Sequence, residues 1–187
     1  MSARIFGSGI RRREDPRLIT GSATYTDDIT LPDMAYAAML RSPHAHATIK
    51  NIDTKAAVAA PGVVAVYTGA DIEGQLEPVP CAWLLPDSDL KIAGYPCIAK
   101  DVVRYTGDIV AVVVADNRYQ AYDALDLIEV DYDPLPTVIN PKAAAKADAP
   151  QLHDDIEGNQ AFHWTVTGGD VDAAFAEAET NGIIIKD

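Results

Sequence analysis

The sequence lacks a hydrophobic run long enough to cross a membrane. Its longest run of apolar residues, Ile109–Ala115, has seven residues, whereas a membrane-spanning helix requires roughly 20. The arginines at Arg11–Arg13 are followed by acidic residues and Pro16 rather than by an apolar segment. A twin-arginine export signal would turn hydrophobic at this point. We therefore expect no export and place the protein in the cytoplasm.

Basic residues are scarce relative to acidic ones. The chain has 15 Lys and Arg against 28 Asp and Glu, which gives a formal net charge of −13 over 187 residues. Nucleic acids and anionic membrane surfaces are bound by basic faces, so this balance argues against both kinds of partner. With 48% hydrophobic and 23% charged residues, the composition is that of a globular chain with one domain and extensions, or two small domains.

Residues in an evident catalytic or metal-binding context are also scarce. His44 and His46 would share one face of a strand, but zinc needs three or four ligands and no acidic or cysteine partner stands with them. Hydrogen bonding at a strand end is the preferred interpretation. Gly168–Gly169 lack the Gly-Lys-Ser/Thr of a phosphate loop, and no Gly-x-Ser-x-Gly occurs. We therefore assign no catalytic, cofactor-binding or metal-binding residue.

Only two cysteines are present, and both lie in a proline-rich stretch, residues 73–99, without regular periodicity. A disulfide between Cys81 and Cys97 and two reduced thiols both fit the sequence, and a reducing cytoplasm favours the thiols. A loop of this length is either functional or covers an interface. Its apolar centre, Trp83-Leu84-Leu85, fits a core contact and a contact with a partner equally well.

What the sequence does contain is a strand, helix, strand pattern between Val102 and Pro136. Ile109–Ala115 is continuous, apolar and largely β-branched, which is typical of a central strand buried on both faces. Asp116 and Asn117 are good N-caps, and apolar residues recur behind them at helical spacing. Ile128–Tyr132 then alternates as a strand. The pattern predicts a β-α-β unit with a right-handed crossover.

The rest of the chain predicts further short elements around this unit. Residues 1–33 show no helical or strand periodicity and are expected to be an extended arm, solvated and mobile in a free-standing domain, with folding back on its own domain as the alternative. Asp53 is expected to cap a short helix, and Asp170 a longer one with an apolar face. The predicted strands are 35–41, 49–52, 63–68, 162–167 and 183–185; the predicted helices are 55–59, 141–145 and 171–178, and Asn181-Gly182 is a predicted hairpin turn.

Several motifs, taken together and in order, resemble the N-terminal part of the molybdenum hydroxylase large subunit. This is the superfamily of xanthine dehydrogenase, aldehyde oxidase and aerobic carbon monoxide dehydrogenase. The most specific motifs are Arg-Ser-Pro-His-Ala-His at Arg41–His46 and Arg-Tyr-x-Gly-Asp followed by the Val-Ala-Val-Val run at Arg104–Pro136. The others are Leu18–Gly21, Tyr25–Pro32, Pro61–Thr68, Gln151–Asp154 with Asn159, and Gly169–Ala178.

The resemblance implies an α+β fold, the α/β hammerhead, with a mixed sheet, a central β-α-β unit and an extended N-terminal arm. It implies an arm over 1–33 that docks along neighbouring parts of the enzyme. It further implies a hammerhead domain over 34–140, and over 141–187 a linker with the start of the cofactor-binding region. The family's molybdopterin loops and its catalytic Glu have no counterpart in this sequence. No cofactor is therefore expected on this chain alone, whereas the complete enzyme would hold molybdopterin, iron-sulfur clusters and FAD.

Two functions from different classes follow. In the first, the chain is a non-catalytic scaffold part or split subunit of a molybdenum hydroxylase acting on aldehydes, N-heterocycles or carbon monoxide. Its partners would be the molybdopterin-binding remainder of the large subunit and the iron-sulfur and flavin subunits. In the second, the same fold is a stand-alone interaction or small-ligand-binding module with no enzyme attached.

Overall fold

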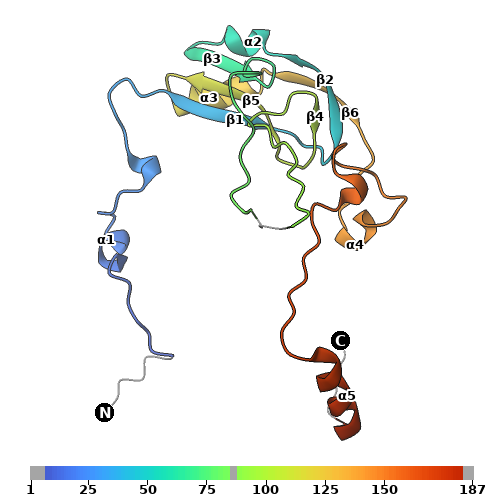
Figure 1. Cartoon of the computed structure of the whole chain (residues 1–187). Coiled ribbons are helices and arrows are strands. Elements are labelled where there is room, and N and C mark those ends of the chain that lie inside the picture. The colour runs from blue at the N-terminus through green and yellow to red at the C-terminus, as the bar shows by residue number, and fades with distance from the viewer. Residues whose placement is uncertain (1–6, 85–87, 183–187) are drawn as a thin grey trace.

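The computed structural model describes residues 7–84 and 88–182 and has an α+β fold with two small antiparallel sheets and short helices. Sheet A has the strand order β1-β5-β3 and sheet B the order β4-β2-β6 (Figure 1). The strands are β1 (Tyr36–Arg41), β2 (Ala47–Asp53), β3 (Val63–Thr68), β4 (Val102–Val103), β5 (Ile109–Ala115) and β6 (Glu129–Pro134). The helices are α1 (Asp15–Ile19), α2 (Lys55–Val58), α3 (Arg118–Leu125), α4 (Pro141–Ala144) and α5 (Val171–Asn181), with 3-10 turns η1 (Thr26–Asp28) and η2 (Glu157–Asn159).

β5 is the central strand of sheet A, as its continuous apolar run predicts. It pairs antiparallel with β1 on one side and with β3 on the other. On one face of the strand, Ala111, Val113 and Ala115 are fully buried beneath alanines of α2 and α3. The small size of these alanines lets both helices lie close to the sheet, and the main core forms there.

A second core joins the two sheets. Ala47 of β2, Val103 of β4 and Val110 of β5 are each 0% exposed and form one cluster with Ala99. The segment before β4 is held to the start of β5 at this point, since the backbone N–H of Ala99 donates to the carbonyl of Ile109 at 2.7 Å. β4, an edge strand of sheet B, therefore packs against β5 of sheet A.

The strand, helix, strand elements are confirmed, but the predicted mixed sheet with a single β-α-β unit is wrong. Asn117 is the N-cap of α3, and its side chain accepts from the backbone N–H of Gln120. After α3, however, β6 joins sheet B and pairs antiparallel with β2, and all the described strand pairings are antiparallel. The apolar side of β6, Val130 and Tyr132, packs against the core cluster of sheet B, so this strand does not return beside β5.

Several predictions for the two ends also need correction. The arm is not without regular structure, because it contains α1 and η1. Residues 162–167 are irregular rather than a strand, and no described strand lies alongside to pair with them. The predicted hairpin turn is instead the end of α5, with Gly182 as a left-handed C-cap at φ 67°. The predicted strand 183–185 and Leu85 lie outside the described residues.

The other local predictions agree with the structure within two residues at each end, except that α5 extends three residues beyond the predicted 171–178. The strands at 35–41, 49–52 and 63–68 are β1, β2 and β3. The short helices are α2 and α4, and Asp170 caps α5 by accepting from the N–H of Ala173. Thr54 is the N-cap of α2, but its neighbour Asp53 accepts the N–H of Lys55 at 3.0 Å as expected of a capping carboxylate. Both ends of the chain leave the sheets and extend away from them (Figure 1).

Candidate functional site

The two most specific sequence motifs meet at one end of the central strand. Ser42, which directly follows β1, donates its backbone N–H to the carbonyl of Asp108 at 2.8 Å. Gly107 returns a bond of 2.8 Å to the carbonyl of Ser42. The guanidinium of Arg41 donates to the carbonyl of Gly107, also at 2.8 Å. The motif at Arg41–His46 is therefore locked onto the turn before β5.

The polar side chains at this junction are buried and hydrogen-bonded. Ser42 is 2% exposed, and its hydroxyl donates to the carbonyl of His44 and accepts from the N–H of His44, both at 3.0 Å. Asp108 is 7% exposed and accepts from the N–H of Arg104 at 3.1 Å. Burial raises the pKa of Tyr132, whose ring lies against that of His44 with the centroids 4.9 Å apart.

The two histidines of this motif point to different partners. The Nδ1 atom of His46 lies 2.9 Å from the carbonyl oxygen of Pro136, which is the strand-end hydrogen bond expected for it. His44 packs on Tyr132 instead. Among the described residues, no group of three or more His, Cys, Asp or Glu side chains is placed to hold a metal ion. The side chain of His46 is thus engaged in a hydrogen bond, and the side chain of His44 in ring packing.

The segment that leaves the sheets is tied back to this junction. The Nε atom of Arg104 donates to the carbonyl of Leu152 at 3.0 Å. Asn159, whose φ is +56°, accepts from the N–H of Leu152 at 2.8 Å and donates to the carbonyls of Ala144 and Pro150. Burial, together with the positive charge of Arg104, lowers the pKa of His153. A hollow of about 430 Å³ lies between this segment and the end of β6.

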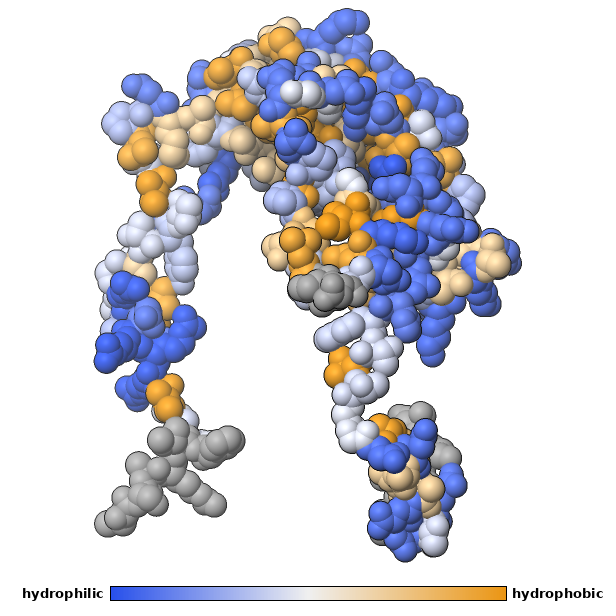
Figure 2. All heavy atoms as spheres, viewed as in Figure 1, coloured by the Kyte–Doolittle hydropathy of each residue, from blue (hydrophilic) through white to orange (hydrophobic). Residues whose placement is uncertain are grey.

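The proline-rich loop between β3 and β4 carries an exposed apolar cluster. Trp83 packs edge-on against Phe162, with the ring centroids 5.0 Å apart, yet it remains 47% exposed. Tyr95 hydrogen-bonds through its phenol to Tyr105, and this bond raises the pKa of Tyr105. Figure 2 shows apolar side chains gathered on this loop beside the grey residues. Trp83 therefore does not occupy a core position. Of the two interpretations of this loop, the contact surface is the one that is left.

Both cysteines of this loop are free thiols. The Sγ atom of Cys81 lies 3.1 Å from the carbonyl oxygen of Trp83, and the Sγ atom of Cys97 lies 3.8 Å from that of Glu77. Between them, the N–H of Val79 donates to the carbonyl of Tyr95. This bond sets Cys97 opposite Glu77, so the two cysteines occupy different levels of the loop and do not face each other.

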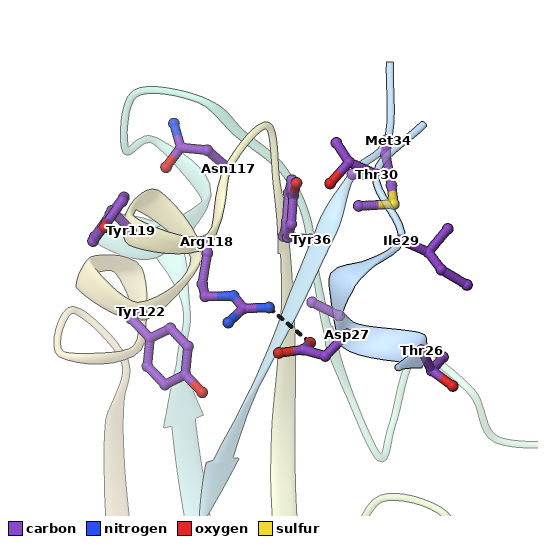
Figure 3. A pocket seen from close by; sticks show the side chains of 12 residues that line it. Thr26, Asp27, Ile29, Thr30, Met34, Tyr36, Asn117, Arg118, Tyr119 and Tyr122 are labelled. Atoms are coloured by element: carbon purple, nitrogen blue, oxygen red, sulfur yellow. Dashed lines mark hydrogen bonds and ion pairs between the residues drawn. The ribbon is translucent and has the colours of Figure 1, made fainter. Parts of the chain in front are cut away.

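Another hollow was not predicted from the sequence. It measures about 840 Å³ and lies between the arm, the start of β1 and the first turn of α3. Figure 3 shows Arg118 pointing across it to Asp27, and their ion pair of 2.8 Å raises the pKa of Arg118. Tyr36, Tyr119 and Tyr122 are among the aromatic side chains of the lining. Arg118 and Asp27 are 91 residues apart, and no local pattern reports so distant a contact.

The glycine pair before α5 lacks the residues of a phosphate loop in the sequence. Gly168–Gly169 precede α5, but Asp170 caps this helix and Asp172 lies in its first turn. Their negative charge opposes the binding of a phosphate, including the phosphate of a molybdopterin. The start of α5 thus does not fit the phosphate of that cofactor. No helix within the described ranges is long and apolar enough to cross a membrane.

Comparison with known proteins gives one consistent result. Residues 20–136 match the family described as aldehyde oxidase and xanthine dehydrogenase, a/b hammerhead domain. The carbon monoxide dehydrogenase large chain of Afipia carboxidovorans is 38% identical over 97% of this chain and 23% of its own length. The xanthine dehydrogenase molybdenum-binding subunit of Escherichia coli O157:H7 is 33% identical over 86% of this chain and 21% of its own length.

A solved structure agrees with these two sequences. Quinoline 2-oxidoreductase from Pseudomonas putida 86 is similar with a TM-score of 0.73 and 40% sequence identity, over 83% of this chain and 19% of that chain. The chain thus spans about a fifth of the length of each of these relatives.

Proposed function

The chain belongs to the molybdenum hydroxylase family through its a/b hammerhead domain, and on this premise we propose that it acts as the non-catalytic N-terminal scaffold of a large subunit. In this proposal residues 34–140 form the hammerhead domain, residues 1–33 the docking arm, and residues 141–187 the linker into the cofactor-binding region. The chain supplies shape and contact surface, while the redox chemistry belongs to the remainder of the enzyme.

The observation that carries this proposal is the uncovered apolar face of α5. Val171 is 53% exposed and Phe175 is 48% exposed, and with Ala174 and Ala178 they line a shallow hollow on the helix. None of the residues of α5 is buried. An isolated helix of this length is marginal in water, and most helical stability comes from burying one face. The helix therefore requires a partner surface, which the proposed scaffold role provides.

The activity of the whole enzyme follows from the family as a further part of the proposal. We expect the oxidation or hydroxylation of an aldehyde, an N-heterocycle or carbon monoxide, with molybdopterin held by the remainder of the large subunit. Iron-sulfur and flavin subunits would carry the electrons away. The hammerhead would hold its partner in place through packing and hydrogen bonding alone.

Affinity purification of the tagged chain from its native host, with molybdenum measured in the eluate, tests the proposal. The expected result is recovery of a molybdenum-containing polypeptide in stoichiometric amount. Phe175→Glu should reduce this recovery at least ten-fold, because it places a charge on the apolar face of α5. Ala176→Glu is the matched control, since it adds the same charge on the opposite side of the same helix, and it should leave recovery unchanged.

Two outcomes would contradict the proposal. A clean monomer under gentle conditions, with no molybdenum in the eluate, would favour the stand-alone interaction or ligand-binding module. Molybdenum retained by the purified chain alone would show that the chain holds its own redox centre.

A further inference from the structure

One face of sheet A is apolar, and none of the core clusters formed by the described residues includes the side chains at its centre. Its side chains form two rows across the strands in the order β1, β5, β3. In one row Met39 pairs with Val112, which pairs with Tyr67. In the other row Ala37 pairs with Val114, which pairs with Ala65. We call these six residues the open face. At its rim, the guanidinium of Arg41 lies 3.8 Å from the Sδ atom of Met39.

The two faces of β5 differ in how far other parts of the chain bury them. Ala111, Val113 and Ala115 are 0% exposed beneath α2 and α3, while Val112 and Val114 on the other face are only half-buried. Met39 and Tyr67, which flank Val112, are each 46% exposed. A continuous β-branched run such as β5 is typical of strands covered on both faces. The sequence of β5 therefore suits a cover that the described residues do not supply.

We infer that the open face docks against the part of the large subunit that this chain does not contain, an inference that rests on the proposed function. The occupant is expected to present an apolar, uncharged surface, because the six side chains carry no charge. About four fifths of the length of the similar large subunits lies outside the region matched by this chain, so sufficient polypeptide exists to cover it.

The size of the open face favours this occupant over a second copy of the chain. Three strands about 4.8 Å apart and two rows about 7 Å apart give a patch of roughly 200 Å². A stable complex of separate proteins buries about 800 Å² on each partner. A patch this small can be held by a partner that is tethered in the same large subunit or docked at further points, since tethering raises the effective concentration.

A charge placed on the open face tests the inference in the assembled large subunit. Met39→Glu should lower recovery of the molybdenum-containing assembly at least ten-fold, because the glutamate would be buried against an apolar surface without a partner. Val58→Glu is the matched control. Val58 is 54% exposed on α2, which covers the opposite face of sheet A, so its substitution should leave recovery within two-fold of wild type.

The outcomes separate this inference from the proposed function. Equal recovery of the two variants, whether both normal or both reduced, would overturn the open face as a docking site while the scaffold role stands. Failure of the wild-type chain to associate with a molybdenum polypeptide would overturn both.

A second measurement on the wild-type assembly does not depend on how the variants fold. Oxidation of Met39 by hydrogen peroxide, followed by mass spectrometry, should be at least ten-fold slower in the native assembly than in urea. Oxidation of Met39 at the same rate in both states would show that the face is uncovered, and would contradict the inference.

Discussion

Ser42 is the most extensively hydrogen-bonded residue of the motif at Arg41–His46. Its backbone N–H, its backbone carbonyl and its hydroxyl all form hydrogen bonds. Ser42→Ala removes only the hydroxyl, which leaves the N–H and carbonyl of His44 without their partner in a site that is 2% exposed. An unsatisfied buried polar group costs about 1–3 kcal/mol. We expect the free energy of unfolding to fall by this amount in urea titrations of the purified chain.

The exposed Thr137 provides the control for this substitution. Thr137→Ala removes a hydroxyl from a side chain that water can reach, and it should change the free energy of unfolding by less than about 0.5 kcal/mol. Equal effects of the two substitutions would mean that the Ser42 hydroxyl does not stabilise the junction.

His153 makes the stability of the linker depend on pH. Burial is the main cause of its lowered pKa, Arg104 and His46 act in the same direction, and Asp154 and Asp155 oppose them. The unfolded chain, with an ordinary histidine pKa near 6.5, therefore binds the proton more readily than the folded chain. The stabilisation is complete above this value and is lost as the pH falls through the lowered folded pKa.

We expect wild type to lose more stability between pH 7.5 and pH 5.5 than His153→Gln, measured as the urea midpoint at each pH. His163→Gln, at an exposed position, should follow wild type over the same range. Identical pH profiles for wild type and His153→Gln would show that this side chain does not couple protonation to folding.

At the scale of the elements, the sequence predicted what is local and missed what is not. The N-cap Asn117 and the apolar run of β5 were both identified, because capping and burial leave their pattern within a few residues. The sheet that β6 joins was not predicted. The alternation of apolar and polar residues indicates a strand with one buried side, but it does not indicate which strand pairs with it. A contact of the arm with its own domain was one of the two alternatives, but its pairing of Asp27 with Arg118 was not predicted for the same reason.

The contact between the two ends of the connection from β3 to β4 yields a prediction at this scale. Gly69 follows β3, and a Cβ atom built on it would lie 2.6 Å from the carbonyl oxygen of Ala99 and 2.8 Å from the Cα atom of Lys100. Backbone atoms cannot move aside as a flexible side chain can. Gly69→Ala should therefore destabilise the fold by about 1–3 kcal/mol, measured by thermal or urea unfolding.

Gly94→Ala, in the same connection between β3 and β4, is the matched control. Its Cβ would meet nothing within 4 Å, so we expect its unfolding midpoint to stay close to that of wild type. A wild-type midpoint for Gly69→Ala would mean that the Ala99 segment can withdraw without cost.

At the scale of the whole molecule, the chain divides into a core that is held by its own contacts and a C-terminal helix, α5, that has no buried residue. The two sheets share buried side chains, and residues 150–160 are fastened to them through Arg104 and Asn159. The next residues lie against the long loop: the N–H of Lys91 donates to the carbonyl of Ala161, and the N–H of His163 to the carboxylate of Asp89. Beyond them, α5 buries nothing. The boundary of independent stability should therefore fall between Phe162 and α5.

Two truncations locate this boundary. Ending the chain at Gly168 removes α5 but keeps the contacts of Ala161, Phe162 and His163, so the thermal midpoint should change by less than about 2 °C, a few tenths of a kcal/mol for a domain of this size. Ending it at Asn159 removes both hydrogen bonds and the Trp83 ring contact, and should lower the midpoint by several degrees, about 1 kcal/mol or more. If the first truncation lowers the midpoint as far as the second, α5 packs on the core of the isolated chain. Its apolar face would then be occupied before any partner arrives, and the principal support for the scaffold role would be removed.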